Sequence, residues 1–349
     1  NNTYLDGSSE TVCVIDTGID YSHPALGNCD PVTYELNGDI EELNVSIESN
    51  HPYENSFDYT WKIKRSGFEK IAVHFTNISL EEIPENGDTT DRIYVYDKYN
   101  NTIAIYKGNM GNVWSPHGEG DTIYVRLVTD GSIGEYGFHI DNLFNGTTYM
   151  RMDWSSCEKF VGGWDTYNND FDPIDDHGHG THVAGIIASM DETYKGVAPG
   201  AKLAAIKAMS SSGGGYSSDV LAGIEWCVSN SESLNISVIS MSLGCSGPSC
   251  PHYQTYCNND LLAQPISDAY NKNISVFIAS GNSGWVDGVA NPSCVEHATP
   301  VGGIMSNYQI VFNRGNLLSL VAPSNNIHST YLSGGWILSS GTSMATPHV

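Results

Sequence analysis

Apolar and polar residues follow two different patterns along this chain of 349 residues. In residues 1–30 and 157–349, short uninterrupted apolar segments alternate with segments whose apolar residues recur at helical spacing. Residues 31–156 instead alternate apolar with polar side chains. The first pattern predicts buried strands separated by amphipathic helices, and the second predicts strands that bury only one face.

The outer segments predict an α/β fold in which helices flank a parallel sheet, because strand and helix alternate along them. Apolar runs such as "TVCVID" lead into loops rich in Gly and Ser, so functional loops are expected at the carboxyl ends of the strands. The predicted strands are residues 11–16, 202–209, 236–244 and 274–284, and the predicted helices are residues 183–190, 217–228 and 261–273.

The central segment predicts an antiparallel β-sandwich inserted into a loop of the α/β domain. Its alternating stretches include "KIAVHFTNISL" and "DTIYVRLVTDG", and turn residues (Asn, Gly and Asp) separate them. Such an insertion costs little when its two ends lie close together. We therefore expect residues 1–30 and 157–349 to form one domain and residues 31–156 to form another.

The charge of the chain narrows the range of functions that it can have. It carries 15 Lys and Arg against 40 Asp and Glu, which gives a formal net charge of −25. Such a field repels polyphosphates and anionic lipid headgroups, so we exclude nucleic-acid and membrane-surface binding. No apolar run approaches the roughly 18 residues that a membrane-spanning helix needs, so no membrane span is expected.

Cysteines and glycosylation sequons favour an exported protein. Eight cysteines are typical of an oxidising compartment, and Asn-x-Ser/Thr sequons are glycosylated on that route. The chain begins with Asn rather than Met, so upstream sequence is expected to be missing. We therefore expect a secreted glycoprotein. The sequons include Asn44, Asn77, Asn100, Asn145, Asn235 and Asn273.

Asp16, His179 and Ser343 lie where an α/β protein is expected to carry reactive side chains. Asp16 ends a predicted strand, His179 precedes a predicted helix, and Ser343 lies among small residues in "GTSMATPHV". A serine hydroxyl is a weak nucleophile that needs a base, and that base needs an orienting carboxylate. The three residues supply these parts.

Other interpretations of these residues stay open at this point. Asp16 also suits an Asx turn after a strand, and "HGHGTH" offers His177 and His182 as rival bases. We expect His182 to face the helix side and to be structural. A zinc site among the histidines is disfavoured, because the H-x-x-x-H pattern with its glutamate is absent.

Further blocks follow one another along the chain, among them "DDHGHGTHVAGIIAS", "KGVAPGAKLAAIKAM", "FIASGNSG" and "SSGTSMATPHV". With these blocks the sequence resembles the subtilisin-like serine proteases, the subtilases, over about residues 11–30 and 157–349. The resemblance implies a subtilisin-like fold and a secreted serine endopeptidase that forms an acyl-enzyme and needs no cofactor for catalysis. Protein or peptide substrates and a cleaved propeptide are the implied partners.

The resemblance also implies a role for each matching residue. Ser343 would attack the scissile carbonyl, His179 would be the general base and acid, and Asp16 would orient the imidazole. Asn282 would donate to the oxyanion, although a loop asparagine with positive φ is the alternative. The residues expected to bind an extended peptide, with flexible turns as the alternative, are Gly213, Gly214, Gly215, Ser242, Leu243, Gly244, Ala279, Ser280 and Gly281.

The central segment resembles a CUB-like β-sandwich, a binding module of extracellular proteins. That resemblance implies a structural Ca²⁺ ion held by Glu81, Asp91 and Asp130, because clustered carboxylate oxygens suit a hard cation. A solvated acidic rim is the equal alternative. The partner of this domain is not indicated by the sequence.

Disulfides are the expected source of stability, because "SMDETYKGVAP" is too short for the calcium loop that many bacterial subtilases carry after the histidine helix. Cys29 and Cys157 bracket the central segment, and we expect them to be bonded. One of Cys245, Cys250 and Cys257 is expected to reach Cys294, whereas Cys13 and Cys227 are expected to be buried thiols.

Two other functions compete with the protease. One is a catalytically inactive protease scaffold that presents the inserted domain to a partner, but all four expected catalytic residues are retained. The other is an esterase, which needs no peptide-binding edges. Because subtilases continue beyond the serine helix, we expect residues 1–349 to lack the C-terminal part of the catalytic domain, and to be poorly stable and weakly active by themselves.

Overall fold

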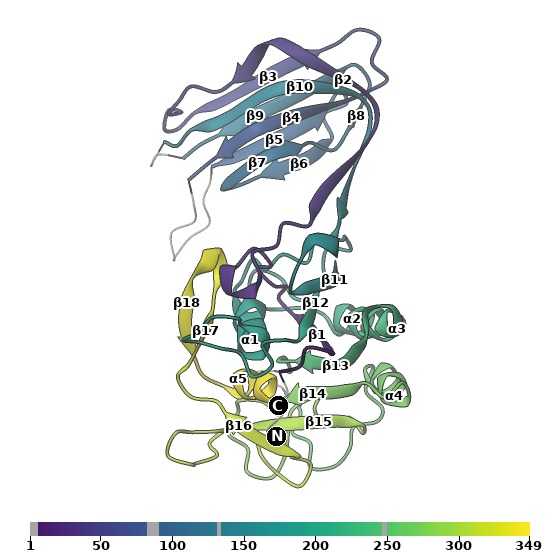
Figure 1. The fold of residues 1–349 in the computed structure, drawn as a ribbon, viewed down its shortest axis with the longest axis vertical. Helices are drawn as coiled ribbons and strands as arrows, with labels where there is room; N and C mark the ends of the chain where they lie inside the picture. The colour runs from purple at the N-terminus through teal and green to yellow at the C-terminus, as the bar shows by residue number, and fades with distance from the viewer. Residues whose placement is uncertain (1–5, 82–90, 131–133, 246–249) are drawn as a thin grey trace. The chain divides into compact units, whose positions relative to one another are not determined.

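The computed structural model describes residues 6–81, 91–130, 134–245 and 250–349. The chain forms two compact units, which Figure 1 shows as ribbons. The first, called the α/β unit below, comprises Asn1–Pro31 and Met152–Val349, and the second, called the insert, comprises Val32–Arg151. Among the described residues, no helix combines the length and apolar character needed to cross a membrane.

A seven-stranded sheet in which all neighbouring strands are parallel forms the centre of the α/β unit. Its third strand, Thr11–Asp16, is fully buried, as expected for a strand covered on both faces. In sheet order the strands are β11 (Phe160–Asp165), β12 (Lys202–Lys207), β1 (Thr11–Asp16), β13 (Ile236–Met241), β14 (Ser275–Ala279), β15 (Ala298–Ile304) and β16 (Leu320–Pro323).

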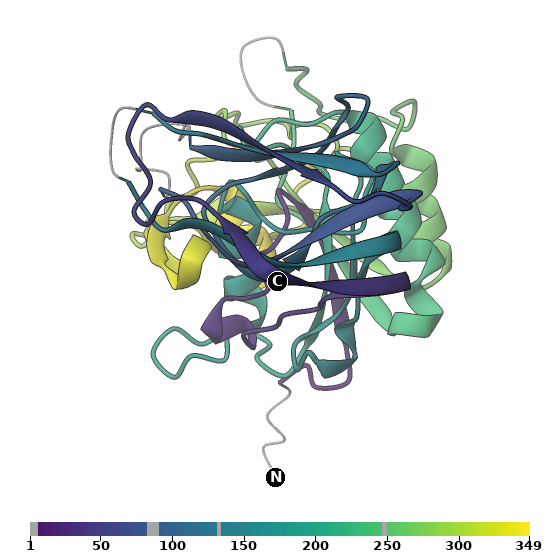
Figure 2. The same cartoon turned by 90° about the horizontal axis from the view of Figure 1, so that it is seen from above.

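Helices cover both faces of this sheet. Because successive side chains of a strand point to opposite faces, Ile15 packs in one core with α2 (Ser217–Ser229) and α4 (Ala263–Asn271). Val14 packs in the other core with α1 (His179–Ala188). Figures 1 and 2 show α2 and α4 side by side. The remaining helical turns are η1 (Pro24–Leu26), η2 (Trp154–Ser156), α3 (Ser231–Leu234), η3 (Leu332–Gly334), α5 (Thr342–Ala345) and η4 (Thr346–His348).

A hairpin of β17 (Ile327–Thr330) and β18 (Trp336–Ser339) packs against α1. The hydroxyl of Thr330 donates to the carbonyl of Thr181 at 2.7 Å. A Cβ at Gly185 would lie 2.2 Å from the Thr330 hydroxyl oxygen, so only glycine allows this approach.

The insert consists of two sheets that share one hydrophobic core, to which β4, β10, β5 and β9 contribute buried residues. Strand residues alternate between buried and partly exposed, as in β5, which explains the period of two in the sequence. One sheet comprises β2 (Val32–Glu48), β10 (Gly137–Met152), β4 (Lys70–Ser79), β7 (Asn109–Trp114) and β8 (Gly118–Glu119), and the other comprises β3 (Asp58–Lys64), β9 (Thr122–Val128), β5 (Arg92–Asp97) and β6 (Thr102–Tyr106).

All eight cysteines lie in the described part of the chain, and all are bonded. Cys29 pairs with Cys157, which confirms the expected bond between the two segments that flank the insert. Cys294 pairs with Cys257, one of its three expected partners, and Cys245 pairs with Cys250. The expectation of buried thiols at Cys13 and Cys227 was wrong, because β1 and α2 bring them together across 214 residues of sequence.

Helix α1 begins earlier than predicted. The apolar spacing predicts a start at Val183, whereas the helix starts at His179. The side chain of Asp175 accepts hydrogen bonds from backbone N–H groups at this end, including that of Thr181. Polar contacts of this kind extend a helix beyond its apolar stripe.

We predict that Phe75→Ala lowers the free energy of unfolding of the insert by about 3–5 kcal/mol, because it leaves a cavity in the core. Phe75 is 0% exposed and packs against the rings of Tyr106 and Phe138. Denaturant unfolding measures the loss, with Val45→Ala as the control at a side chain that is 79% exposed. Equal unfolding free energies for the two variants would contradict the core described above.

Candidate active site

Residues from neighbouring strand ends meet at a cleft of about 420 Å³ in the α/β unit. Asp16 is the last residue of β1, and Ser242 and Asn282 lie in the loops that follow β13 and β14. His179 begins α1, and Ser343 is the second residue of α5. The residues that line the cleft are Thr17, His177, His179, Met209, Ser212, Gly213, Ser242, Leu243, Gly244, Cys245, Ala279, Gly281, Asn282, Ser283, Thr342 and Ser343.

His179 is hydrogen bonded to Asp16, with Nδ1 2.6 Å from Oδ1. The backbone N–H of Thr17 donates to the same oxygen at 2.8 Å. Asp16 is fully buried, and these two hydrogen bonds hold its carboxylate against the imidazole. Because a carboxylate only accepts, the proton of neutral His179 resides on Nδ1, and Nε2 keeps its lone pair. His179 is therefore arranged as a base.

Two opposing effects set the pKa of His179. Burial lowers it, and this is the largest single effect, but the charge of Asp16 and the hydrogen bond to Asp16 raise it. The charge of Asp175 raises it further, and the net result is a pKa above the ordinary value of 6.5. The site thus favours the imidazolium that forms when the base takes up a proton.

The close approach of α1 to the β1 loop depends on a glycine. A Cβ at Gly180 would lie 2.0 Å from the carbonyl oxygen of Gly18, so any side chain there would push the helix away. The N–H of Gly180 also donates to the hydroxyl of Thr17 at 2.9 Å. Gly180 therefore allows His179 to reach Asp16.

Ser343 is held by a reciprocal pair of hydrogen bonds with Ser242. Ser343 Oγ donates to the Ser242 carbonyl at 3.1 Å, and Ser242 Oγ donates to the Ser343 carbonyl at 2.8 Å. A hydroxyl has one proton to donate, so Ser343 must leave this carbonyl before it can donate to His179. As a residue of the first turn of α5, Ser343 also has a backbone N–H without a helical partner.

The side-chain amide of Asn282 is oriented by Thr342. Its Oδ1 accepts from the backbone N–H of Thr342 at 2.9 Å and from the Thr342 hydroxyl at 3.0 Å. Because both contacts require an acceptor, the Nδ2 donor is the atom that remains for a ligand. No partner within the described chain occupies that donor.

The nine expected peptide-binding residues divide between the cleft and the protein behind it. Six of them line the cleft, and the three that do not are Gly214, Gly215 and Ser280. Ser280 is 0% exposed, and its hydroxyl donates to the carbonyl of Asn313 at 2.9 Å. Gly215 lies against the protein, since a Cβ there would approach the Ala208 carbonyl oxygen to 2.4 Å.

The two rival histidines differ in their surroundings. His177 lines the cleft, and its ring centroid lies 6.3 Å from that of His179. His182 is buried, and its Nε2 lies within hydrogen-bond distance of the carbonyls of Ile327 and Ile337. Both partners only accept, so Nε2 carries the proton. Nδ1 is buried and His182 does not line the cleft, so His182 is not placed to act as a base there.

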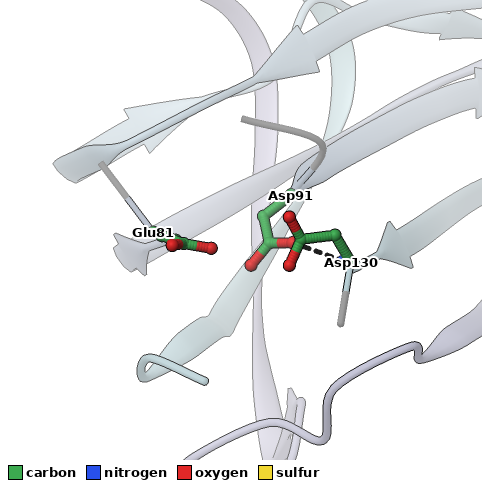
Figure 3. Close-up of side chains that lie close together, drawn as sticks. All are labelled: Glu81, Asp91 and Asp130. Carbon is green, nitrogen blue, oxygen red and sulfur yellow. Dashed lines mark hydrogen bonds between the residues drawn. The ribbon is translucent and has the colours of Figure 1, made fainter. Parts of the chain in front are cut away.

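Three carboxylates of the insert form a separate cluster. One ligand oxygen each from Glu81, Asp91 and Asp130 lies within 4.8 Å of the others, and Figure 3 shows the side chains directed toward one another. Asp91 is fully buried and accepts from the hydroxyl of Tyr53 at 2.6 Å and from the N–H of Asp130 at 2.7 Å. It is the only group of this kind among the described residues, and it contains no histidine.

A model of the subtilase family matches residues 7–349 of the chain. This chain is a subtilase. It is a serine endopeptidase, as the names of its relatives indicate. It is 28% identical over 338 residues to "Thermophilic serine proteinase" of Bacillus sp. (strain AK1), a match that covers 89% of this chain and 79% of the relative.

A second relative of this subtilase is subtilisin DY of Bacillus licheniformis, which is 38% identical over 198 residues, or 55% of this chain and 67% of the relative. A solved structure, a cold-adapted subtilisin-like serine proteinase, is 33% identical with a TM-score of 0.46 and covers 54% of this chain and 64% of its own.

Several cleft residues of this subtilase were not predicted from its sequence. Thr17, Met209 and Thr342 line the cleft beside predicted residues. The signal for Thr17 and Thr342 was their position next to Asp16 and Ser343. Asp175 was missed as well, although an acidic residue shortly before a helix start is a common capping signal. The neighbouring Asp176 gives the same signal, so the sequence does not distinguish the two.

We predict that His182 makes this subtilase less stable in acid. Burial lowers the pKa of His182 from 6.5 to about 4. Between these values the unfolded chain binds the proton and the folded chain does not, so stability falls as the pH decreases from 6.5 to 4, by up to roughly 3 kcal/mol. In His182→Gln, which cannot titrate, this contribution should be absent from the unfolding free energy measured against pH.

His297→Gln serves as the control for that experiment, because His297 lies outside the hairpin that His182 contacts. A His182→Gln protein whose stability decreases with acid as steeply as that of the wild type would contradict the prediction.

Proposed function

We propose that Ser343, His179, Asp16 and Asn282 together hydrolyse peptide bonds in the cleft. The observation that carries this proposal is the 2.6 Å hydrogen bond between His179 Nδ1 and Asp16 Oδ1 at a cleft that Ser343 and Asn282 also line. The hydrogen bond to Asp16 leaves Nε2 of His179 free to act as a base, and Ser343 supplies a hydroxyl in the same cleft.

In the first half of the reaction, Ser343 Oγ attacks the scissile carbonyl carbon while its proton passes to His179 Nε2. The negative charge of Asp16 stabilises the imidazolium, in keeping with the raised pKa of His179. The carbonyl oxygen becomes an oxyanion, to which the Asn282 Nδ2 and the Ser343 N–H donate. His179 then protonates the leaving amine as the C–N bond breaks, which leaves the acyl-enzyme.

Water completes the reaction by the same steps in the opposite order. His179 Nε2 takes a proton from water, which attacks the ester carbonyl of acylated Ser343, and returns a proton to Ser343 Oγ as the acid product departs. Protonation of His179 removes the base, so kcat/KM is expected to fall as the pH decreases through a raised pKa.

The substrate is proposed to be an extended peptide. Gly213 at one edge of the cleft and Ser242, Leu243 and Gly244 at another offer backbone groups, against which a peptide can pair as an added strand. Ala279 and Gly281 are proposed to form a wall of the pocket for its side chain. An esterase would have no use for two such edges.

An exported enzyme is the setting we propose, with a propeptide removed on maturation and glycans on its sequons. Four disulfides support it, because such bonds persist in oxidising compartments. The inactive-scaffold alternative has no observation in its favour, since His179 and Asp16 keep a hydrogen bond suited to catalysis.

Ser343→Ala is expected to abolish labelling by a fluorophosphonate probe, because no other group replaces the nucleophile. Ser340→Ala, three residues earlier, should label as the wild type does. Asn282→Ala should label slowly and lose kcat; in subtilisin the loss of one oxyanion-hole donor costs about 10²–10³. Absence of labelling in the folded wild type would refute the proposed mechanism, and labelling of Ser343→Ala would refute the nucleophile.

For the insert we propose a CUB-like β-sandwich that binds Ca²⁺ through Glu81, Asp91 and Asp130. The donors fit this ion, because calcium takes carboxylate oxygens at about 2.3–2.6 Å, so opposite ligands lie roughly 5 Å apart. The separations within the cluster do not exceed 4.8 Å. A cation would also offset the charge of the fully buried Asp91.

Calcium is expected to raise the melting temperature of the wild-type protein, because a ligand of the native state stabilises that state. Glu81→Gln removes a charged ligand and should lose this shift. Glu119→Gln is the matched control, since Glu119 is exposed in the same unit and pairs with Lys70. A calcium shift in Glu81→Gln as large as in the control would exclude the site.

A further inference from the structure

Asp175 is a buried carboxylate beside the active site that the mechanism above does not use. It precedes α1 by four residues and is 6% exposed. A buried charge is costly unless hydrogen bonds satisfy it, so its partners indicate what it does.

Five hydrogen bonds converge on the two oxygens of Asp175. Oδ1 accepts from the hydroxyl of Thr17 and from the N–H groups of His177 and Gly178, each at 2.9 Å. Oδ2 accepts from the N–H of Thr181 at 2.9 Å and from its hydroxyl at 2.6 Å. All the partners are donors, so the ionised carboxylate, which is acceptor-only, satisfies them.

These bonds join the two segments that carry the catalytic acid and base. Thr17 follows Asp16 in sequence, whereas His177, Gly178 and Thr181 surround His179. The Thr17 hydroxyl also accepts from the N–H of Gly180 at 2.9 Å, so the two segments meet at that oxygen as well. A capping residue alone would need no contact with the β1 loop.

We infer that Asp175 is a positioning residue that holds the Asp16 carboxylate and the His179 imidazole in register. The inference rests on the proposed roles of Asp16 and His179. Because general-base catalysis depends on that geometry, loss of the Asp175 carboxylate should reduce kcat and leave substrate binding nearly unchanged.

Asp175 also acts on His179 through its charge. Burial lowers the pKa of His179, and after the charge and hydrogen bond of Asp16, the charge of Asp175 is a further influence that raises it. Other titratable groups near His179 include His177, whose ring lies 6.3 Å away, and the buried His182. Tyr331 donates to the carbonyl of His177, and Lys207 pairs with Asp176 and donates to the carbonyl of Thr17. Removal of the Asp175 charge should therefore lower the pKa of His179, which a purely structural role would not do.

The test is Asp175→Asn in the full chain, with kcat and KM measured on a peptide substrate across the pH range. We expect kcat to fall about 10- to 100-fold, KM to stay within about twofold, and the acidic limb of kcat/KM to move to lower pH. Asp191→Asn is the control, because Asp191 follows the other end of α1 and its carboxylate accepts from the N–H groups of Thr193 and Tyr194. Its kinetics should match those of the wild type.

Thr17→Val provides a second measurement that does not depend on the folding of Asp175→Asn. It removes the hydroxyl bridge but keeps the Asp175 charge, so kcat should fall while the acidic limb stays in place. If folded Asp175→Asn keeps the wild-type kcat, the inference is overturned. If Asp175→Asn does not fold, a wild-type kcat in Thr17→Val overturns it instead. An inactive wild type would instead refute the proposed function, so the two failures are distinguishable.

Discussion

Parallel pairing of the seven central strands is the constraint on which the active site depends. When neighbouring strands run in the same direction, their carboxyl ends lie at one edge of the sheet, so the loops that follow them are adjacent. The loops after β1, β13 and β14 lie in that order and bring Thr17, Ser242 and Asn282 to one cleft, with Asp16 buried beside Thr17 at the end of β1. Residues separated by more than 200 positions in the sequence thus form one site.

The insert can be accommodated because it does not interrupt this pairing. The chain leaves the α/β unit after Pro31 and re-enters it at Met152, before β11, the edge strand of the sheet. The register of β11 is set by β12 and not by the connection that precedes it. The disulfide between Cys29 and Cys157 joins the two chain segments that flank the insert. It holds them together in the unfolded chain as well, which reduces the entropy cost of closing so long a loop on folding.

Sequence alone predicted those parts of the molecule whose signal is local. The strand 11–16 and the helix 217–228 match β1 and α2 closely, because burial and amphipathic spacing determine them. The start of α1 was missed, since it depends on Asp175, which lies outside the apolar stripe. The bond between Cys13 and Cys227 was missed for a similar reason, because only the packing of α2 on β1 brings the two together. Motif blocks predicted Asp16, His179 and Ser343 as site residues, and the structure places the bonded Asp16–His179 pair at a cleft that Ser343 also lines. The hydrogen bond of Ser343 to Ser242 has no sequence signal.

The buried carboxylates at the candidate active site make their contacts with groups other than Lys and Arg. Asp16 and Asp175 are both buried, and their partners are mostly backbone N–H groups and hydroxyls rather than Lys or Arg. The buried Lys207 illustrates the same principle, since its ammonium donates to the carbonyls of Thr17 and Met209 besides pairing with Asp176. Oriented dipoles of this kind are held by the fold and do not reorganise when charge moves. The charges of both carboxylates raise the pKa of His179, so both stabilise its imidazolium form.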